Sequence, residues 1–186
     1  TRGLWGPAVG RSLVCAGELR KCQAIVVAHF DMDYLLFERA GALDREGFGD
    51  RVIIPVKCSK RDETQPNEAD KAVAEAFCRL AKIKVPLLLP VNEKEPISYH
   101  VARQVGEKLE KEGIRSVILV SSGLRSRRDF LIFKKVLVGK GIAVTCVPVF
   151  GEKTPANWMN SWHGFQEVFL QTGKLWYYRL KLFLLP

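Results

Sequence analysis

The stretch VILVSSGLRSRRDF, residues Val117 to Phe130, decides the fold. It begins as a continuous apolar run and then passes through Ser121-Ser122-Gly123. Three arginines follow, at positions Arg125, Arg127 and Arg128. Strands that are apolar at every position are typical of parallel sheets covered on both faces. Small residues between such a strand and a helix are typical of the edge where these sheets bind ligands. The stretch therefore predicts a buried strand, a turn and a helix, with a binding edge between them.

Similar apolar runs recur along the chain and alternate with segments of helical periodicity. We expect strands over 23–30, 51–57, 85–91, 116–122 and 142–150. Helices are expected over 33–48, 67–83, 98–113 and 125–141. Such alternation indicates an α/β fold, namely a three-layer Rossmann-like domain with a mostly parallel sheet of about five strands. A C-terminal aromatic helix completes the predicted fold.

Polar residues and prolines suggest where these elements begin or break. Asp31 or Asp33 is the expected N-cap of the first helix of the core, and Asn67 that of the second. Ser98 is the expected cap of the helix over 98–113. Pro55 lies inside an apolar run and predicts a bulge or a weaker strand there.

Length and composition favour one globular unit. The chain has 186 residues, of which 47% are hydrophobic. We expect an N-terminal extension over 1–22, an α/β core over 23–150, and an aromatic and basic helical segment over 151–186 packed on the core. No apolar run reaches the length of about 18 residues that a membrane span needs. The chain begins at Thr1 without a methionine, which leaves room for an upstream signal or membrane anchor.

The charge balance points to anionic partners. Lys and Arg number 29 against 20 Asp and Glu, a formal net charge of +9. Such a charge favours phosphorylated small molecules, an acidic membrane surface or nucleic acid. Nucleic acid is the weakest of these, because the basic residues are scattered and no nucleic-acid-binding motif is present.

The cysteines predict a reduced protein without zinc. The five are Cys15, Cys22, Cys58, Cys78 and Cys146, an odd number without a CxxC pair. That pattern argues against a zinc site and against a disulfide-stapled fold. Because Cys78 and Cys146 sit inside apolar patterns, we interpret them as small core residues.

The strongest candidate site is an anion cradle at Ser121, Ser122, Gly123, Arg125 and Arg128. Small residues let a ligand approach the backbone, and the following helix directs its first N–H groups toward the strand end. Arginine is unfavourable near a helix N-terminus unless an anion is bound there. The alternative is an ordinary helix start with solvated arginines.

Catalytic candidates are few. His29, Asp31 and Asp33 follow the first strand, but three ligands in one loop give weak support for metal, and we expect none. Glu68 or Asp31 is the candidate base if the protein is an enzyme. An enzyme of this kind also requires Glu68 and Arg128 in one cleft.

The C-terminal segment admits two interpretations. It is a final helix whose aromatic residues fill the core, or an interfacial helix that meets a membrane or a partner. The second interpretation assigns this contact to Trp158, Trp162, Trp176, Tyr177, Arg179 and Lys181.

The stretch GIRSVILVSSGLRSRRDFLIFKKVL resembles the YdcF/SanA/ElyC-like bacterial family of Rossmann-like domains, which typically shows LVT-S-x-Y-H-x-x-R-A at this point. The resemblance runs in order from about residue 21 through QAIVVAHF, NEADKAVAEAF and LLLPVNEKEPISYHVARQVGEKL to FQEVFLQTGKLWYYRLK. The residues that survive from the family pattern are Glu68, Ser98, Ser121, Ser122 and Arg128. The resemblance thereby adds Ser98 to the ligand-binding candidates of the cradle. The family's glycine-rich turns after the first two strands are missing, and Arg125 replaces its histidine.

The resemblance implies a domain that binds an anionic small molecule, with its chemistry weakened or lost. The implied ligands are a nucleotide, an S-adenosylmethionine-like molecule or a phosphorylated lipid carrier. It also implies a bacterial protein associated with the membrane or cell envelope. One alternative is a hydrolase or transferase that acts on a phosphorylated substrate. The other is a structural or accessory subunit of a membrane complex with a vestigial pocket.

Overall fold

A computed structural model describes residues 2–28, 32–59 and 62–184 of the chain. Its centre is a five-stranded sheet with the strand order β3-β2-β1-β4-β5, and every pair of neighbouring strands is parallel. The strands are β1 (Ala24–Val27), β2 (Val52–Lys57), β3 (Pro86–Val91), β4 (Ser116–Ser122) and β5 (Ala143–Val149). The predicted α/β architecture with a parallel sheet of five strands is therefore confirmed.

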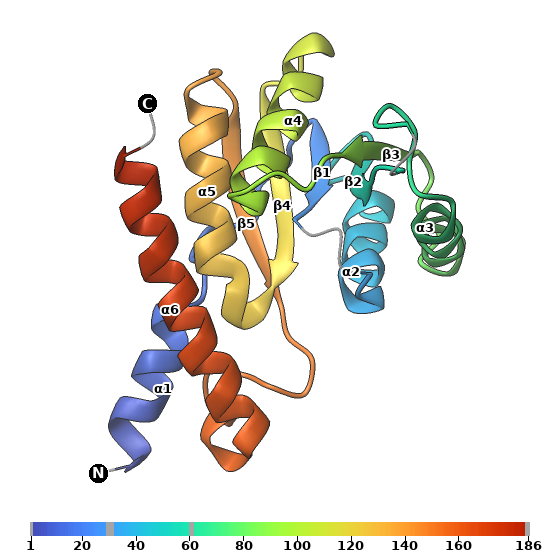
Figure 1. The fold of residues 1–186 in the computed structure, drawn as a ribbon. Coiled ribbons are helices and arrows are strands. Elements are labelled where there is room, and N and C mark those ends of the chain that lie inside the picture. The colour runs from blue at the N-terminus through green and yellow to red at the C-terminus, as the bar shows by residue number, and fades with distance from the viewer. Residues whose placement is uncertain (1, 29–31, 60–61, 185–186) are drawn as a thin grey trace.

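Helices cover both faces of the sheet (Figure 1). The α-helices are α1 (Arg2–Ser12), α2 (Tyr34–Arg45), α3 (Glu68–Leu80), α4 (Ile97–Lys111), α5 (Ser126–Val138) and α6 (Trp162–Leu184). Two short 3₁₀ turns are η1 (Gly123–Arg125) and η2 (Trp158–Asn160). Helices α2 and α3 share one apolar core with the sheet, and α4 and α5 share the other. Helix α6 lies outside α5, at the periphery of the molecule (Figure 1).

Strand β1 shows why the sheet is buried. All four of its side chains are fully buried. Ile25 and Val27 face α2 and α3, whereas Ala24 and Val26 face α4 and α5. Because side chains alternate along a strand, a central strand between two helical layers must be apolar at every position. This is the physical basis of the sequence pattern.

Pro55 causes no bulge. The register of β2 with β3 runs without interruption from Val52↔Pro86 to Lys57↔Val91. Among the described residues, β2 pairs with β1 only up to Ile53, so Pro55 lies beyond the end of this pairing. Proline is tolerated at such a position because no ladder hydrogen bond is lost.

The expected helix caps are confirmed in two cases of three. Asp33 Oδ1 accepts a hydrogen bond from the Leu35 N–H at 3.1 Å. Asn67 Oδ1 accepts from the N–H groups of Ala69 and Asp70 at 3.0 and 3.3 Å. The prediction for Ser98 is wrong, because α4 begins one residue earlier, after Pro96, without a side-chain cap.

The N-terminal extension contains a helix that the sequence did not indicate. Helix α1 packs on η2, where the indole Nε1 of Trp158 donates to the Gly6 carbonyl at 2.8 Å. A disulfide between Cys15 and Cys146 joins the residues after α1 to β5, with a Cα–Cα distance of 6.2 Å. The expectation of five reduced cysteines is therefore wrong for this pair. The interpretation of Cys78 as a free, buried core residue is confirmed.

Within the described part of the chain, no helix has both the length and the apolar character needed to cross a membrane.

Candidate functional site

A cavity of about 320 Å³ lies at the carboxyl ends of β4 and β5. Ser122 and Val149, the last residues of these strands, form part of its wall, and Asp33 at the start of α2 forms another part. The chain leaves β1 for one face of the sheet and leaves β4 for the other. In parallel sheets ligands bind at this kind of divergence, outside the carboxyl ends of the strands. The cavity therefore occupies the position expected for a binding site in this fold.

The cavity wall carries charges of both signs. The basic residues are Arg125 and Lys153, and the acidic residues are Asp33, Glu152 and Glu167. Lys153 Nζ lies 3.3 Å from Glu167 Oε2, and the Asp33 carboxylate is held by its role as the cap of α2. The wall thus presents cationic groups together with acceptors for hydrogen-bond donors.

Three of the predicted cradle residues, Ser122, Gly123 and Arg125, line this cavity. Gly123 has a structural reason to lack a side chain, because a Cβ there would overlap the ring of Phe150. The ring of Phe150 occupies the space beside Gly123 that we expected a ligand to use.

The other two cradle residues, Ser121 and Arg128, are structural, and their assignment to ligand binding is corrected. The Ser121 hydroxyl is fully buried and donates to Asp129 Oδ2 at 2.6 Å. Arg128 donates from Nε and Nη2 to Asp129 Oδ1 at 3.1 and 3.0 Å. Its Nη1 donates to Gln171 Oε1 of α6 at 3.0 Å. Arg128 is only 6% exposed, so it joins α5 to α6 and does not face the cavity.

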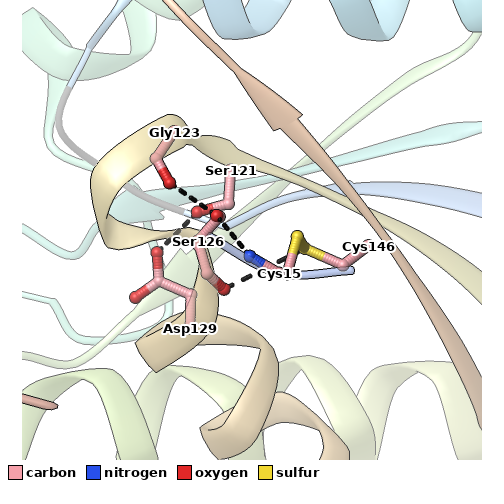
Figure 2. The surroundings of a disulfide bond; sticks show 6 residues. All are labelled: Cys15, Ser121, Gly123, Ser126, Asp129 and Cys146. Atoms are coloured by element: carbon pink, nitrogen blue, oxygen red, sulfur yellow. Dashed lines mark hydrogen bonds between the residues drawn. A yellow bond between two sulfur atoms is a disulfide. The ribbon is translucent and has the colours of Figure 1, made fainter. Parts of the chain in front are cut away.

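The N-terminal segment is hydrogen-bonded to the start of α5 (Figure 2). The Arg127 N–H donates to the Leu13 carbonyl at 3.0 Å. The Ser126 hydroxyl accepts from the Cys15 N–H at 3.0 Å and donates to the Gly123 carbonyl at 2.6 Å. The disulfide to Cys146 fixes this contact beside the helix start. The start of α5 is therefore occupied by residues of the chain itself, and the cavity of Ser122, Gly123 and Arg125 lies beside it.

The remaining predicted site residues do not converge with Arg125. Glu68 begins α3 with its side chain exposed, and its carboxylate lies 4.0 Å from Lys71 Nζ. Helices α3 and α5 cover opposite faces of the sheet, so Glu68 and Arg128 share no cleft. The Ser98 N–H donates to the Tyr178 hydroxyl at 3.3 Å, beneath α6. Asp31 and His29 lie outside the described residues.

At the strand ends that the structure describes, no free thiol has a lowered pKa. Cys58 follows β2, and burial together with the charges of Glu63 and Asp62 raises the pKa of its thiol. A raised pKa leaves the thiol protonated at neutral pH and weakens it as a nucleophile. Over the residues that the structure describes, no cluster of His, Cys, Asp and Glu is suited to hold a metal ion.

The C-terminal aromatic residues divide into two groups. Trp158 is buried between α1 and α6, so its assignment to a membrane or partner contact is wrong. Trp162, Trp176 and Tyr177 are exposed on α6, as are Arg179 and Lys181. The predicted helix is therefore partly core and partly surface.

Sequence reasoning missed the cavity residues that follow β5, notably Glu152, Lys153 and Glu167. Strand β5 lies beside β4, so the segment after it approaches the same edge of the sheet. The sequence predicts a strand over 142–150, and Glu152 and Lys153 directly after it are the signal that points to this part of the cavity.

No protein family, curated protein or solved structure compared with this chain matches it.

Proposed function

We propose that this chain is a ligand-binding α/β domain that holds an anionic small molecule at the carboxyl ends of β4 and β5. The observation that carries this function is the cavity beside the divergence of β1 and β4, lined by Ser122, Gly123, Arg125 and Lys153. Its volume of about 320 Å³ falls within the range of about 300–1,000 Å³ that is usual for small-molecule sites. The resemblance to YdcF-like domains agrees with this role and remains part of the proposal.

The charges of the cavity favour a ligand with an anionic group and several hydrogen-bond donors. Arg125 and Lys153 suit a phosphate or carboxylate. Asp33, Glu152 and Glu167 suit hydroxyl or ammonium groups, as an acidic residue binds ribose hydroxyls in many nucleotide sites. A nucleotide or an S-adenosylmethionine-like molecule has both kinds of group. A bare phosphate or a polyprenyl phosphate would pair only with the basic residues of the cavity wall, Arg125 and Lys153.

We assign no catalytic step to this cavity, so the domain is proposed to be non-catalytic or weakly active. The candidate base Glu68 does not line the cavity and lies on α3, which packs on the face of the sheet opposite to α5. The free thiol of Cys58 has a raised pKa and is a poor nucleophile. These placements favour binding over the alternative of a hydrolase or transferase.

We further propose a bacterial envelope location. The support is the Cys15–Cys146 disulfide, because disulfides persist in oxidising compartments and are rare in the reducing cytosol. The exposed aromatic residues of α6 agree with a site near a membrane.

A thermal-shift screen tests the binding function. The compounds are AMP, ATP, S-adenosylmethionine, phosphate, pyrophosphate and a soluble polyprenyl-phosphate analogue. A ligand at about one hundred times its Kd adds about 2.7 kcal/mol of stability. We expect AMP or S-adenosylmethionine to raise the Tm of the wild type.

The matched variants are Arg125→Ala, which removes a cavity guanidinium, and Arg79→Ala, which removes an exposed one on α3. The Tm increase is expected to disappear in the first and to persist in the second. A wild type that responds to none of the compounds, or an equal response in both variants, overturns the proposed site.

A further inference from the structure

Large apolar side chains recur on the exposed side of α6, from its first turn to its last. These residues, here called the outer face, are Trp162, Phe165, Phe169, Trp176, Leu180 and Phe183. Their exposed fractions run from 46% at Phe165 to 85% at Phe183. Four of them, Trp162, Phe169, Trp176 and Phe183, recur at intervals of seven residues, which keeps them in one line along the helix. Extended apolar patches of this kind mark interaction sites on soluble proteins.

The fold does not require this face. The side of α6 that packs on the domain carries its own set of buried residues, Gly164, Val168, Gln171, Leu175 and Tyr178. They meet the core through contacts such as the hydrogen bond between Gln171 and Arg128. An apolar helix side that is not needed for folding is costly to leave in water, because each exposed large side chain forgoes its burial energy. The outer face therefore needs an occupant outside the described chain.

Cationic side chains flank the outer face. Lys174, Arg179 and Lys181 are all exposed and lie in the C-terminal half of α6. The Arg179 guanidinium lies over the ring of Trp176, 5.0 Å from its centroid, and Lys181 Nζ lies 6.0 Å from the ring centroid of Tyr177. Two of the three cations thus accompany an exposed aromatic ring.

Acidic side chains are almost absent from the same helix. Glu167 is the one acidic residue of α6, and its carboxylate pairs with Lys153. Parallel pairing with a second copy of this chain would bring Lys174, Arg179 and Lys181 against the same cations, and in any pairing both copies carry a net charge of +9. Like charges across an interface are strongly unfavourable, so charge argues against self-association through this face. The charge of the outer face and its flanking residues favours an occupant that is apolar at its centre and negative at its surface.

We infer that the outer face of α6 docks on an anionic lipid bilayer, with the helix lying in the plane of the interface. Tryptophan and tyrosine favour the headgroup region, where an apolar ring and a polar group are both satisfied. Lysine and arginine beside them extend toward lipid phosphates while their stems stay on apolar surface. A helix with apolar aromatic residues on one side and flanking cations is typical of this mode of binding. The inference does not depend on the ligand of the cavity.

Vesicle co-sedimentation of the whole protein tests the docking. The probes are vesicles of phosphatidylcholine alone and of phosphatidylcholine mixed with phosphatidylglycerol. We expect the protein to sediment with the anionic vesicles, to stay in the supernatant with neutral ones, and to be released by added salt, since salt screens the lipid charge.

The decisive variant is the double substitution Phe169→Gln and Trp176→Gln. Its matched control is Leu80→Gln with Val138→Gln, which removes two large side chains of similar exposure from α3 and α5. All four residues are exposed, so both variants are expected to keep the Tm of the wild type. The first is expected to lose at least tenfold in vesicle affinity and the second to lose none.

Three outcomes overturn the inference. They are a wild type that ignores anionic vesicles, a Phe169/Trp176 variant that binds them like the wild type, and a control variant that loses binding equally. A wild type that is dimeric in light scattering, becomes monomeric in the Phe169/Trp176 variant and binds no vesicle would identify the occupant as a second copy.

Discussion

Arg128 donates a hydrogen bond from Nη1 to Gln171 Oε1 at 3.0 Å, across the buried contact between α5 and α6. The same guanidinium pairs with Asp129, which in turn accepts from Ser121 at the end of β4. One arginine thus connects the central sheet, α5 and the C-terminal helix. Its position explains why a residue that resembles a ligand-binding arginine is part of the framework.

Replacing Arg128 with alanine is expected to destabilise the fold by about 3–5 kcal/mol, because the buried Asp129 loses the guanidinium that pairs with it. Denaturant unfolding measures this loss. The double variant Arg128→Met with Asp129→Leu is expected to recover most of it, since no buried charge remains. A single variant as stable as the wild type would show that Arg128 is exposed in solution.

The close approach of α6 to η2 depends on Gly164. A Cβ at this position would overlap the carbonyl oxygen of Trp158. Gly164→Ala is therefore expected to cost about 1–3 kcal/mol, because the helix must shift away from the domain. Unfolding by denaturant measures the change.

Gly173 of the same helix supplies the control, since a Cβ built there has no contact within 4 Å apart from its chain neighbours and the backbone of its own helix. Gly173→Ala is expected to stabilise the protein by about 0.5–1 kcal/mol through helix propensity. Equal effects of the two substitutions would contradict the packing of α6 at Trp158.

Sequence reasoning succeeded where the deciding interactions are local. The apolar run that ends at Val120 predicted β4, and Asp33 and Asn67 cap helices that begin at the next residue. Each of these features depends on neighbours within one turn of the chain or on burial on both faces of a sheet.

The features that were missed depend on contacts between distant segments. The Cys15–Cys146 disulfide joins residues 131 positions apart, and no spacing rule indicates it. Arg128 is buried because α6 covers it with Gln171, a fact that the sequence around Arg128 does not contain. The cavity gains Glu167 only because α6 returns to the end of β4.

The disulfide is expected to contribute substantially to stability. It closes a long loop, and such cross-links are typically worth about 2–4 kcal/mol by restricting the unfolded chain. Cys15→Ser is expected to lower the Tm by roughly 5–15 °C for a chain of this size. Cys22→Ser, at a free cysteine, is the control and is expected to change the Tm little.

Thiol titration of the unreduced, unfolded protein independently tests whether the Cys15–Cys146 disulfide is present. It should find three reactive thiols, since Cys22, Cys58 and Cys78 are free. Five reactive thiols would show that the bond is absent.

The stability of the protein is expected to fall at alkaline pH because of the thiol of Cys78. Burial raises the pKa of its thiol from 9.0 to about 11. The folded state therefore holds this proton more tightly than the unfolded chain, so the contribution to stability is complete below pH 9.0 and is lost as the pH rises through about 11.

The free energy of unfolding of the wild type and of Cys78→Ala, measured below and above pH 9.0, tests this dependence. The wild-type advantage is expected to shrink as the pH rises, because only the wild type has this thiol to ionise. A constant difference between the two proteins would contradict the buried, protonated thiol.

The most direct test of the central claim locates the ligand by NMR, through the amide chemical shifts of the ¹⁵N-labelled protein with AMP and with S-adenosylmethionine. We predict shift changes at 122–125 and 151–153, around the cavity at the ends of β4 and β5, and none at Glu68 or Arg128. A second cavity, of about 520 Å³, lies beside Arg20 and Lys21 near the amino ends of the same strands and serves as an internal control. No shift change with either compound, or changes confined to that second cavity, would contradict the proposed site.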